Sequence, residues 1–170
     1  MFNHEKESSL SHEWLLSNVK YYPDAGQLWW AKSGRGRNRS KPINGRHAGG
    51  YLRIRIFGEF YMQHRVIWFY MTGEWPKDQI DHINGVRDDN RWENLREATA
   101  VQNSRNRRAS KNNKSGFKGV YLCKQTKKWS ACIWLNGKSV NLGRFDWPKE
   151  AHEAYCKAAK ENHGEFASFD

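Results

Sequence analysis

Asp81 and His82 are adjacent, and their side chains together could hydrolyse a phosphodiester bond. That reaction needs a base to deprotonate water and a hard cation to neutralise charge on the phosphate and the departing 3′ oxygen. A histidine suits the first task, because its pKa of roughly 6.5 leaves much of the imidazole neutral near neutral pH. A carboxylate suits the second, since magnesium and manganese prefer oxygen ligands. The pair therefore predicts a nuclease site with one divalent cation, Mg or Mn.

The residues around this pair are expected to form a short hairpin followed by a helix. The expected elements are a strand at 79–83, a polar loop at 84–93, a returning strand at 94–98, and a helix from its N-cap Thr99 to about residue 108. Adjacent side chains of a strand face opposite ways, so Asp81 and His82 need a bend to meet one phosphate. The Asn84-Gly85 turn supplies that bend. Asn103 lies one turn inside the helix, and packing can bring it over Asp81.

This stretch resembles the HNH endonuclease family, in which a hairpin and a helix hold one metal ion in the ββα-metal arrangement. The elements that carry the resemblance are Asp81-His82, Asn84-Gly85, Asn90, Asn94 to Arg96, and Asn103. The resemblance implies that His82 is the general base and that Asp81 and Asn103 bind the metal. It also implies that Asn94 ties the loop between the strands together. Asparagine as the third letter makes this the H-N-N variant, as in the phage nicking enzymes that the chain resembles.

Three further side chains are expected to support the site. Asn84 and Asn90 shape the loop, and the asparagine at position 84 replaces a commoner aspartate, which removes a charge near the metal. His64 and Arg65 open an expected helix that Gly73 and Pro76 end; His64 is interpreted as a hydrogen-bonded support, and Arg65 is placed near a phosphate. An isolated Asp-His pair is more often part of a solvated loop. Five matching elements at family spacing favour the nuclease site instead.

Basic residues are concentrated in two segments that contain no aspartate or glutamate, 25–58 and 98–145, within a chain of net charge +11. Such a distribution points to a polyanionic partner. In the first segment, expected strands at 27–31 and 51–57 flank a polar loop. The second strand alternates apolar residues with Arg53 and Arg55, so its basic side could lie along phosphates or could simply be a solvated face. In the second segment, the candidate DNA contacts nearest the nuclease site are Arg105, Arg107, Arg108, Lys111 and Lys114.

The C-terminal part has the pattern of a small sheet packed on a helix. Expected strands at 117–123, 129–135 and 138–143 precede a helix that begins at Pro148 and ends before Gly164, and Asn136-Gly137 is a hairpin turn. The helix presents an apolar stripe of Ala151, Ala154, Tyr155, Ala158 and Ala159. In the middle strand, alternation places Trp129, Ala131, Ile133 and Leu135 against this stripe and Ser130, Cys132 and Trp134 on the open face. An exposed tryptophan on a basic sheet suggests a face that binds a partner.

This part resembles the plant ethylene-response-factor DNA-binding domain, which also occurs fused to phage HNH endonucleases. Lys118 to Val120, Leu142 to Phe145 and the alanine-rich helix carry the resemblance. It implies that the sheet lies in the major groove of DNA, with these residues facing it: Lys118, Tyr121, Lys128, Trp134, Ser139 and Asn141. Family arginines are replaced at Tyr121, Trp134 and Ser139. Arginine to guanine is the commonest specific base contact, so the family's target sequence does not carry over.

Together these patterns predict an α+β protein. An N-terminal region at 1–108, with a ββα-metal HNH module at about 61–108, precedes a basic linker at 109–116 and a domain at 117–170 that has a three-stranded antiparallel sheet packed on one helix. No apolar run approaches the roughly 20 residues that span a bilayer, and no secretory signal is found. Cys123, Cys132 and Cys156 have neither zinc-site spacing nor an even count. We expect a cytoplasmic protein, in a host cell if phage-encoded, without a membrane or small-molecule partner.

The sequence thus predicts a metal-dependent endonuclease that nicks or cuts double-stranded DNA. The two resemblances suggest a phage homing endonuclease, although a defensive or packaging nuclease would use the same chemistry. A DNA-binding regulator with a decayed HNH motif is the alternative. A structural or RNA-binding protein would account for the positive net charge, but it would give Asp81, His82 and Asn103 no function. The sequence leaves open nicking or double-strand cutting, and a monomer or a dimer.

Overall fold

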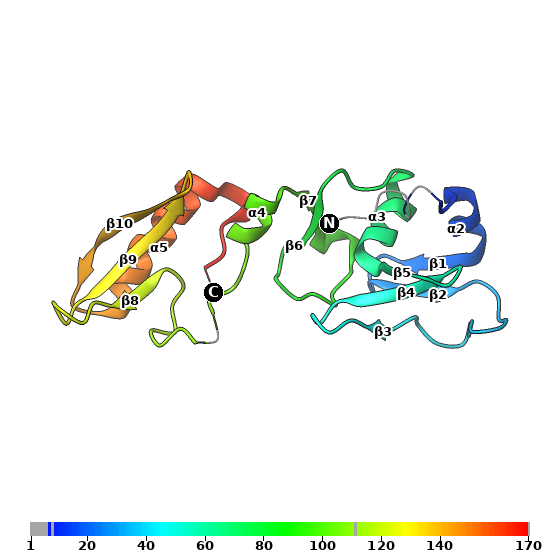
Figure 1. Cartoon of the computed structure of the whole chain (residues 1–170), viewed down its shortest axis with the longest axis horizontal. Helices are drawn as coiled ribbons and strands as arrows, with labels where there is room; N and C mark the ends of the chain where they lie inside the picture. Colours follow the sequence, from blue (N-terminus) through cyan, green and yellow to red (C-terminus); the bar gives the residue numbers. More distant parts are fainter. Residues whose placement is uncertain (1–6, 8, 111, 170) are drawn as a thin grey trace. The chain divides into compact units, whose positions relative to one another are not determined.

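The computed structural model describes residue 7, residues 9–110 and residues 112–169, so Lys111 lies outside the described residues. Internal contacts divide the chain into two compact units, Met1–Thr99 and Ala100–Asp170 (Figure 1). The domain boundaries expected at 108 and 117 stay predictions. Each unit mixes helix and strand. Among the described residues, no helix is both long and apolar enough to cross a membrane.

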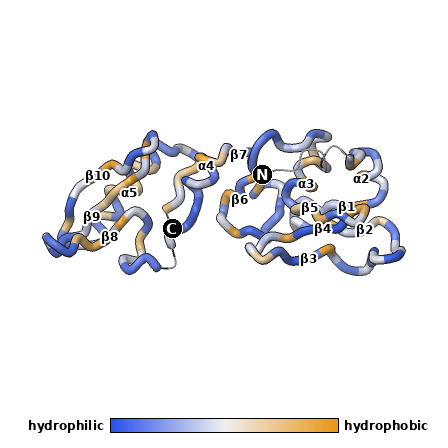
Figure 2. Tube along the Cα trace, viewed as in Figure 1, coloured by the Kyte–Doolittle hydropathy of each residue, from blue (hydrophilic) through white to orange (hydrophobic). Residues whose placement is uncertain are grey.

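The described residues of the first unit form three antiparallel sheets. Its elements are α2 (His12–Asn18), β1 (Val19–Tyr22), β2 (Gln27–Trp30), β3 (Gly45–Arg46), β4 (Leu52–Ile56), β5 (Glu59–Met62), α3 (Gln63–Thr72), β6 (Gln79–His82), the 3-10 turn η1 (Trp92–Asn94) and β7 (Leu95–Ala98). The sheet orders are β1-β2, β3-β4-β5 and β6-β7. The segment around β3 is largely hydrophilic (Figure 2), as expected for a polar loop, although it also contributes this short edge strand.

Local signals explain how several of these elements begin and end. The Ser11 side chain caps α2 by accepting a hydrogen bond from Trp14 N at 3.3 Å. Gly73 ends α3 in the left-handed conformation. Helix α3 begins at Gln63, directly before the His64-Arg65 pair that was expected to open it, and the turn at Phe57 and Gly58 returns the chain so that the preceding strand β5 pairs with β4.

The core of the first unit joins its helices to its sheets. Leu15 of α2, Leu28 of β2, Ile54 of β4 and Ile67 of α3 are all at most 1% exposed and belong to one cluster. Ile80 of β6 and Leu95 of β7 extend the same cluster to the hairpin. The hairpin that carries Asp81 and His82 is therefore anchored on the main core.

The second unit is a three-stranded antiparallel sheet packed on one long helix. Its elements are α4 (Ala100–Arg105), β8 (Val120–Leu122), β9 (Trp129–Leu135), β10 (Lys138–Phe145), α5 (Pro148–His163) and η2 (Gly164–Phe166), and the sheet order is β10-β9-β8. Asn136 and Gly137 both have positive φ, 49° and 77°, in the hairpin turn between β9 and β10. Pro148 opens α5 as expected.

Packing between β9 and α5 follows the predicted alternation except at one residue. Ala131 and Ile133 are buried against Ala151, Tyr155 and Ala159 of the helix. Ser130 was expected on the open face but is only 1% exposed. It pairs with Tyr121 of β8 and Arg144 of β10, so longer neighbours cover a small side chain in the central strand.

The helix expected to run to residue 108 is shorter in the structure. It is α4, which ends at Arg105, and residues 107–110 have no regular structure. Six residues are too few to be stable alone, so this helix depends on tertiary packing. Its neighbours within the second unit include η2.

Candidate functional site

The hairpin of β6 and β7 places Asp81 and His82 at the end of a buried strand. In its register, Asp81 lies opposite Arg96, and His82 lies opposite Leu95. Asp81 and His82 are each only 4% exposed. Both side chains are thus held in a low-dielectric setting, where hydrogen bonds and charges act strongly.

Asn90 fixes the His82 ring. His82 Nε2 donates a hydrogen bond to Asn90 Oδ1 at 2.9 Å. An amide oxygen can only accept, so the neutral ring carries its hydrogen at Nε2 and its proton-accepting lone pair at Nδ1. Asn90 is itself 1% exposed, and its backbone oxygen accepts from the Tyr21 hydroxyl at 2.8 Å. Tyr21, which is 69 residues from Asn90 in the sequence, thus helps to set the tautomer of His82.

Gly26 packs against the backbone of Asn90 and Arg91, next to the residue that binds His82. Its φ is +65°, and a Cβ there would lie 2.5 Å from the Arg91 nitrogen and 2.6 Å from the Asn90 carbonyl carbon. Only glycine lets the turn after β1 approach the Asn90 backbone so closely.

A second histidine lies against the first. The rings of His64 and His82 are 5.2 Å apart and nearly perpendicular, and Tyr51 contacts both rings. Burial, together with the smaller effects of His82 and Arg65, lowers the pKa of His64 to about 3. Within the described residues, His64 Nδ1 has no hydrogen-bond partner. His64 is therefore a neutral ring that packs beside His82.

The pKa of His82 is also lowered, chiefly by burial. The hydrogen bond to Asn90 and the negative charge of Asp81 oppose that shift. A lowered pKa keeps the imidazole neutral and able to accept a proton at neutral pH.

Arg96 compensates the Asp81 charge. Its Nε and Nη2 atoms lie 2.9 and 2.8 Å from Asp81 Oδ2. The Arg96 side chain is 13% exposed, so this is a largely buried ion pair. Removing either partner would leave an uncompensated charge in the hairpin.

The loop between the two strands is held by asparagine side chains. Asn94 Oδ1 accepts from Asn84 N at 2.9 Å, and Asn94 Nδ2 donates to the Asp89 carbonyl at 2.7 Å. Asn84 Nδ2 donates to Asp89 Oδ2 at 2.6 Å. Arg91 also binds this carboxylate and lowers the Asp89 pKa to about 2. Asn94 therefore bridges the start and the end of the loop.

The remaining proposed ligand, Asn103, lies on α4 in the second unit, and it is half-buried. Asp81 lies in the first unit, so their pairing stays a prediction. No group of three or more His, Cys, Asp or Glu side chains suited to a metal occurs in the described part of the chain.

Arg65 has a different role from the one expected. It was placed near a phosphate, but it is 5% exposed and forms a buried ion pair with Glu7, with Nε 2.6 Å from Oε1. Its other donors reach the carbonyl oxygens of Asp78 and Pro76. Arg65 thus joins the N-terminal segment to the strand that leads into the site. No local pattern indicates a partner 58 residues away.

The basic side of β4 is exposed only in part. Arg53 and Arg55 both lie over the Phe60 ring of β5, with guanidinium carbons 4.0 and 5.5 Å from its centre. Arg55 Nε also donates to the Gly58 carbonyl at 3.0 Å. The two arginines therefore share one aromatic support on the strand surface.

In the second unit, the expected DNA-facing residues lie mainly on the sheet and its flanks. Trp134 is 65% exposed and Tyr121 is 50% exposed, while Ser139 lies opposite Trp134 in the register. Asn141 Oδ1 accepts from Gly143 N, and Lys128 pairs with Asp146 at 3.1 Å. The other candidates in this unit that the structure describes are Arg107, Arg108 and Lys114, which are exposed, and Lys118 and Arg105, which are half-buried.

Comparison with known proteins identifies the chain. A family model described as HNH endonuclease matches residues 61–105. Protein 3.8 of Escherichia phage T7 is 32% identical over 119 residues, which cover 68% of this chain and 98% of that protein. The chain belongs to the HNH endonuclease family. The resemblance inferred from Asp81, His82 and the asparagines is thereby confirmed.

The HNH match is followed by an AP2 domain at residues 115–165. AP2-like ethylene-responsive transcription factor TOE2 of Arabidopsis thaliana is 38% identical over 55 residues, and APETALA2-like protein 2 of Oryza sativa subsp. indica is 40% identical over 53. These matches cover 32% and 31% of this chain but only 11% and 12% of the plant proteins. No solved structure matches the chain. The second resemblance is confirmed as well.

Two residues of the HNH module were not anticipated in the roles that the structure gives them. Asn90 was expected to shape the loop but binds His82 directly. Arg96 lay within the matching Asn-Leu-Arg run, yet its pairing with Asp81 becomes apparent only from the hairpin register. Cross-strand neighbours in an antiparallel pair often carry opposite charges, so an arginine opposite Asp81 could have been looked for once the register was assumed.

Proposed function

We propose that this protein is a metal-dependent endonuclease that hydrolyses phosphodiester bonds in double-stranded DNA. The observation that carries the proposal is the His82 ring, which is buried, neutral and held through Nε2 by Asn90, beside the buried Asp81. This is the arrangement that a general base needs. The HNH family match and the AP2 domain support DNA as the substrate.

The donor atoms of this chain suit a hard cation. Asp81 offers a buried carboxylate and Asn103 offers an amide oxygen, and both are oxygen ligands of the kind that magnesium and manganese prefer. Two protein ligands leave positions for water and phosphate, which is typical of magnesium. When bound there, the ion would neutralise charge on the scissile phosphate and on the leaving 3′ oxygen.

In the proposed reaction, His82 accepts a proton at Nδ1 from the attacking water. The water oxygen forms a bond to phosphorus, and the bond from phosphorus to the 3′ oxygen breaks. Asn90 keeps the other ring nitrogen in its N–H form, so the lone pair stays at Nδ1 throughout. The Asp81 carboxylate next to the ring favours the imidazolium that results.

The second unit would select the DNA. Its sheet carries Trp134, Tyr121 and Ser139 on exposed positions, where the plant relatives' family has arginines, so a different base sequence is expected. A DNA-cutting enzyme with a separate DNA-reading domain fits a homing role, and similarity to a phage protein supports it. Mapping the cut ends on a DNA library would test this. Scattered cutting without a preferred sequence would contradict the homing role.

Replacing His82 by alanine tests the catalytic proposal. We expect plasmid nicking to fall by about a hundredfold or more, because a general base contributes roughly that factor, while duplex binding stays nearly unchanged. His47→Ala, at an exposed histidine of the same unit, is the matched control. Equal losses of cutting and binding in His82→Ala would remove the catalytic role. If the wild type binds DNA but nicks none, whether or not metal is present, the non-catalytic DNA-binding regulator is favoured instead.

Removal of the metal gives a second test. Chelation with EDTA should stop nicking, and magnesium or manganese should restore it in the wild type but not in Asp81→Asn, which keeps the side-chain size and loses the charge. Nicking is measured on supercoiled plasmid at matched protein concentration. Normal cutting by Asp81→Asn in magnesium would show that the metal assignment is wrong.

A further inference from the structure

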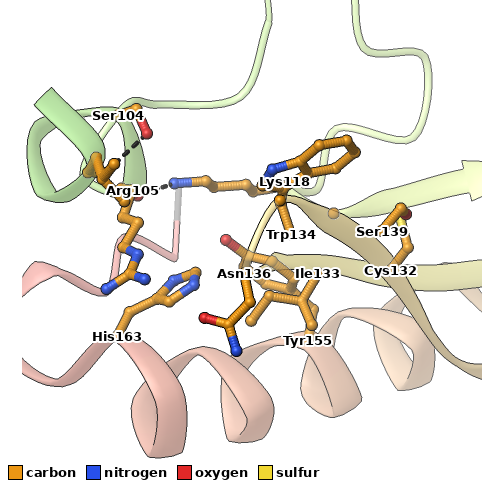
Figure 3. A pocket seen from close by; sticks show the side chains of 13 residues that line it. Ser104, Arg105, Lys118, Cys132, Ile133, Trp134, Asn136, Ser139, Tyr155 and His163 are labelled. Atoms are coloured by element: carbon orange, nitrogen blue, oxygen red, sulfur yellow. Dashed lines mark hydrogen bonds between the residues drawn. The ribbon is translucent and has the colours of Figure 1, made fainter.

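The second unit contains a pocket that the cutting reaction does not use. Its volume is about 660 Å³, within the range of roughly 300–1,000 Å³ that is usual for ligand pockets. It is lined by α4, the turn between β9 and β10, and the C-terminal part of α5. Figure 3 shows Arg105 of α4 and His163 of α5 reaching into it from two sides.

His163 is the buried polar group of this pocket. It is 9% exposed, and neither ring nitrogen has a hydrogen-bond partner of normal geometry among the described residues, although the Trp134 backbone is close enough to influence its pKa. Most buried polar side chains are hydrogen-bonded. A neutral imidazole offers one donor and one acceptor, so a ligand with both kinds of atom would satisfy it.

Two cations make the pocket attractive to an anion. Arg105 and Lys118 line it, and both lie near enough to His163 to lower its pKa, after the larger effect of burial. Lys118 Nζ donates to the Arg105 carbonyl at 2.6 Å, which joins the two residues at one wall (Figure 3). Among the described residues that line the pocket there is no carboxylate. A phosphate group carries the charge and the acceptor oxygens that such a wall binds.

An aromatic side chain lies beside these cations. Trp134 lines the same pocket and is 65% exposed, so one face of its indole is open to a flat ring. Stacking of a base on an aromatic side chain contributes about 1–3 kcal/mol and depends little on which base is present. A ligand that contains both a base and a phosphate could therefore stack on Trp134 and bind Arg105 and Lys118 at the same time.

We propose that this pocket binds a single nucleotide, with its phosphate at Arg105 and Lys118, its base on Trp134 and a polar edge at His163. Two sources offer the same chemistry: a free deoxynucleoside monophosphate and an unpaired nucleotide of a DNA strand. The site is separate from Asp81 and His82, so it does not depend on the cutting reaction.

Titration of the full chain with dTMP, followed by NMR, tests the proposal. We expect saturable shifts of the Trp134 indole N–H with a Kd of about 1 mM or tighter, and a rise in the His163 pKa as the anionic phosphate binds. Thymidine and inorganic phosphate are the partial ligands, and each should bind at least about tenfold more weakly than dTMP. Absence of saturable binding, or phosphate binding as tightly as dTMP, would overturn the proposal.

Two serine variants separate the pocket from general effects on the unit. Ser104 lines the pocket and is exposed, so Ser104→Trp should fill part of it and weaken dTMP binding by about tenfold or more. Ser110→Trp adds the same bulk at an exposed position outside the pocket and should leave dTMP binding unchanged. His163→Gln removes the group whose pKa is expected to rise on dTMP binding, so the pH dependence of dTMP binding should disappear in this variant. Equal dTMP affinities of the two tryptophan variants, both folded by NMR, would contradict the assignment.

The two sources of nucleotide are distinguished by competition. A duplex with one unpaired nucleotide should displace dTMP if the pocket serves DNA, while a fully paired duplex of the same length should do so less well. A paired duplex on the sheet also covers Trp134, so some displacement of dTMP by both duplexes is expected. Stronger displacement by the duplex with the unpaired nucleotide would assign the pocket to DNA, and equal displacement by the two duplexes would assign it to the free nucleotide. Stronger displacement by the fully paired duplex would contradict a site for a single nucleotide.

Discussion

His64 and His82 are two neutral imidazoles in contact, and this makes the first unit sensitive to acid. Burial holds the pKa of His64 at about 3, whereas an unfolded histidine titrates near about 6.5. Below about pH 6.5 the unfolded chain takes up a proton that the folded chain refuses, so stability is full above that pH and falls as pH decreases toward 3. His82 contributes in the same direction.

Replacing His64 by phenylalanine should reduce this acid sensitivity. The free energy of unfolding of the wild-type first unit should fall by at most about 1.4 kcal/mol per pH unit for each such histidine between about pH 6 and pH 4. His64→Phe removes one of them while keeping a ring against Tyr51. Urea unfolding at a series of pH values measures the slope, and exposed His47→Phe is the control. An unchanged slope in His64→Phe would mean that the folded protein protonates His64.

Asn90 gives a second prediction for a single residue. Asn90→Ala removes the acceptor of His82 Nε2–H and should lower kcat by about a hundredfold, because misplacement of a catalytic group by about an ångström has that effect. Asn90→Asp keeps the shape and the acceptor, so it should recover most of the rate at a pH about two units above the ordinary histidine pKa. Nicking under saturating DNA measures kcat. Failure of aspartate to exceed alanine would indicate that Asn90 acts only in packing.

Residue types and spacing predicted the identity of the site better than its contacts. The HNH family was recognised because the Asp81-His82 pair is followed by asparagines at family spacing, and the comparisons confirm that family, whereas the roles of Asp81 and His82 stay predictions. Arg65 was wrongly placed near a phosphate because its partner, Glu7, is 58 residues away and leaves no periodic signal. Ser130 was wrongly placed on an open face because alternation describes one strand and omits the side chains of its two neighbours.

The β6–β7 hairpin, taken as an element, depends on the ion pair between Asp81 and Arg96. Arg96→Met leaves the Asp81 charge buried and should lower the free energy of unfolding of the first unit by about 3 kcal/mol without metal. Magnesium should then raise the melting temperature of Arg96→Met more than that of the wild type, because the cation replaces the lost charge. Calorimetry with and without magnesium measures this, and exposed Arg35→Met is the control. Equal magnesium effects in both proteins would argue against Asp81 as a ligand.

Contact between β8 and α5 gives a prediction for the second unit. Gly119 has φ +73°, and a Cβ there would lie 2.2 Å from the Tyr155 ring and 2.8 Å from the Cys132 carbonyl. Gly119→Ala should therefore destabilise this unit by about 3 kcal/mol or more, since it adds a clash to backbone strain. Gly137→Ala has a similar φ, +77°, with nothing within 4 Å, and should cost about 1–2 kcal/mol. Equal losses on chemical unfolding would show that Tyr155 moves aside.

Elements with strong local signals were predictable, and those fixed by distant packing were not. The strand at 129–135 and the start of the helix at Pro148 coincide with β9 and α5. Strand β5 was not predicted, because Tyr61 and Met62 pair with β4 and the local sequence does not report a neighbouring strand. The end of α4 at Arg105 was also missed, since no glycine or proline follows it directly.

At the scale of the whole molecule, DNA selection and catalysis should appear in different kinetic constants, even for residues of the same unit. Trp134→Ala removes an exposed side chain of the sheet and should raise KM for the mapped target about tenfold while kcat stays within about twofold. Asn103→Ala lies in the same unit, yet it removes a proposed metal ligand and should lower kcat by about a hundredfold with little change in KM. Steady-state nicking separates the two. A change in KM alone for Asn103→Ala would place Asn103 in DNA binding.

The short helix α4 has a consequence for exchanging modules between proteins. It lies within the HNH match at residues 61–105, but its contacts group it with the AP2 domain, and Lys118 binds its last carbonyl. A chimera joined after residue 105 would keep the family motif intact while removing the support that this six-residue helix receives. A workable graft of a new DNA-reading domain therefore needs a lysine or another donor at the position of Lys118. The boundary for exchanging domains is therefore set by the contact between Lys118 and Arg105 and not by a single position in the sequence.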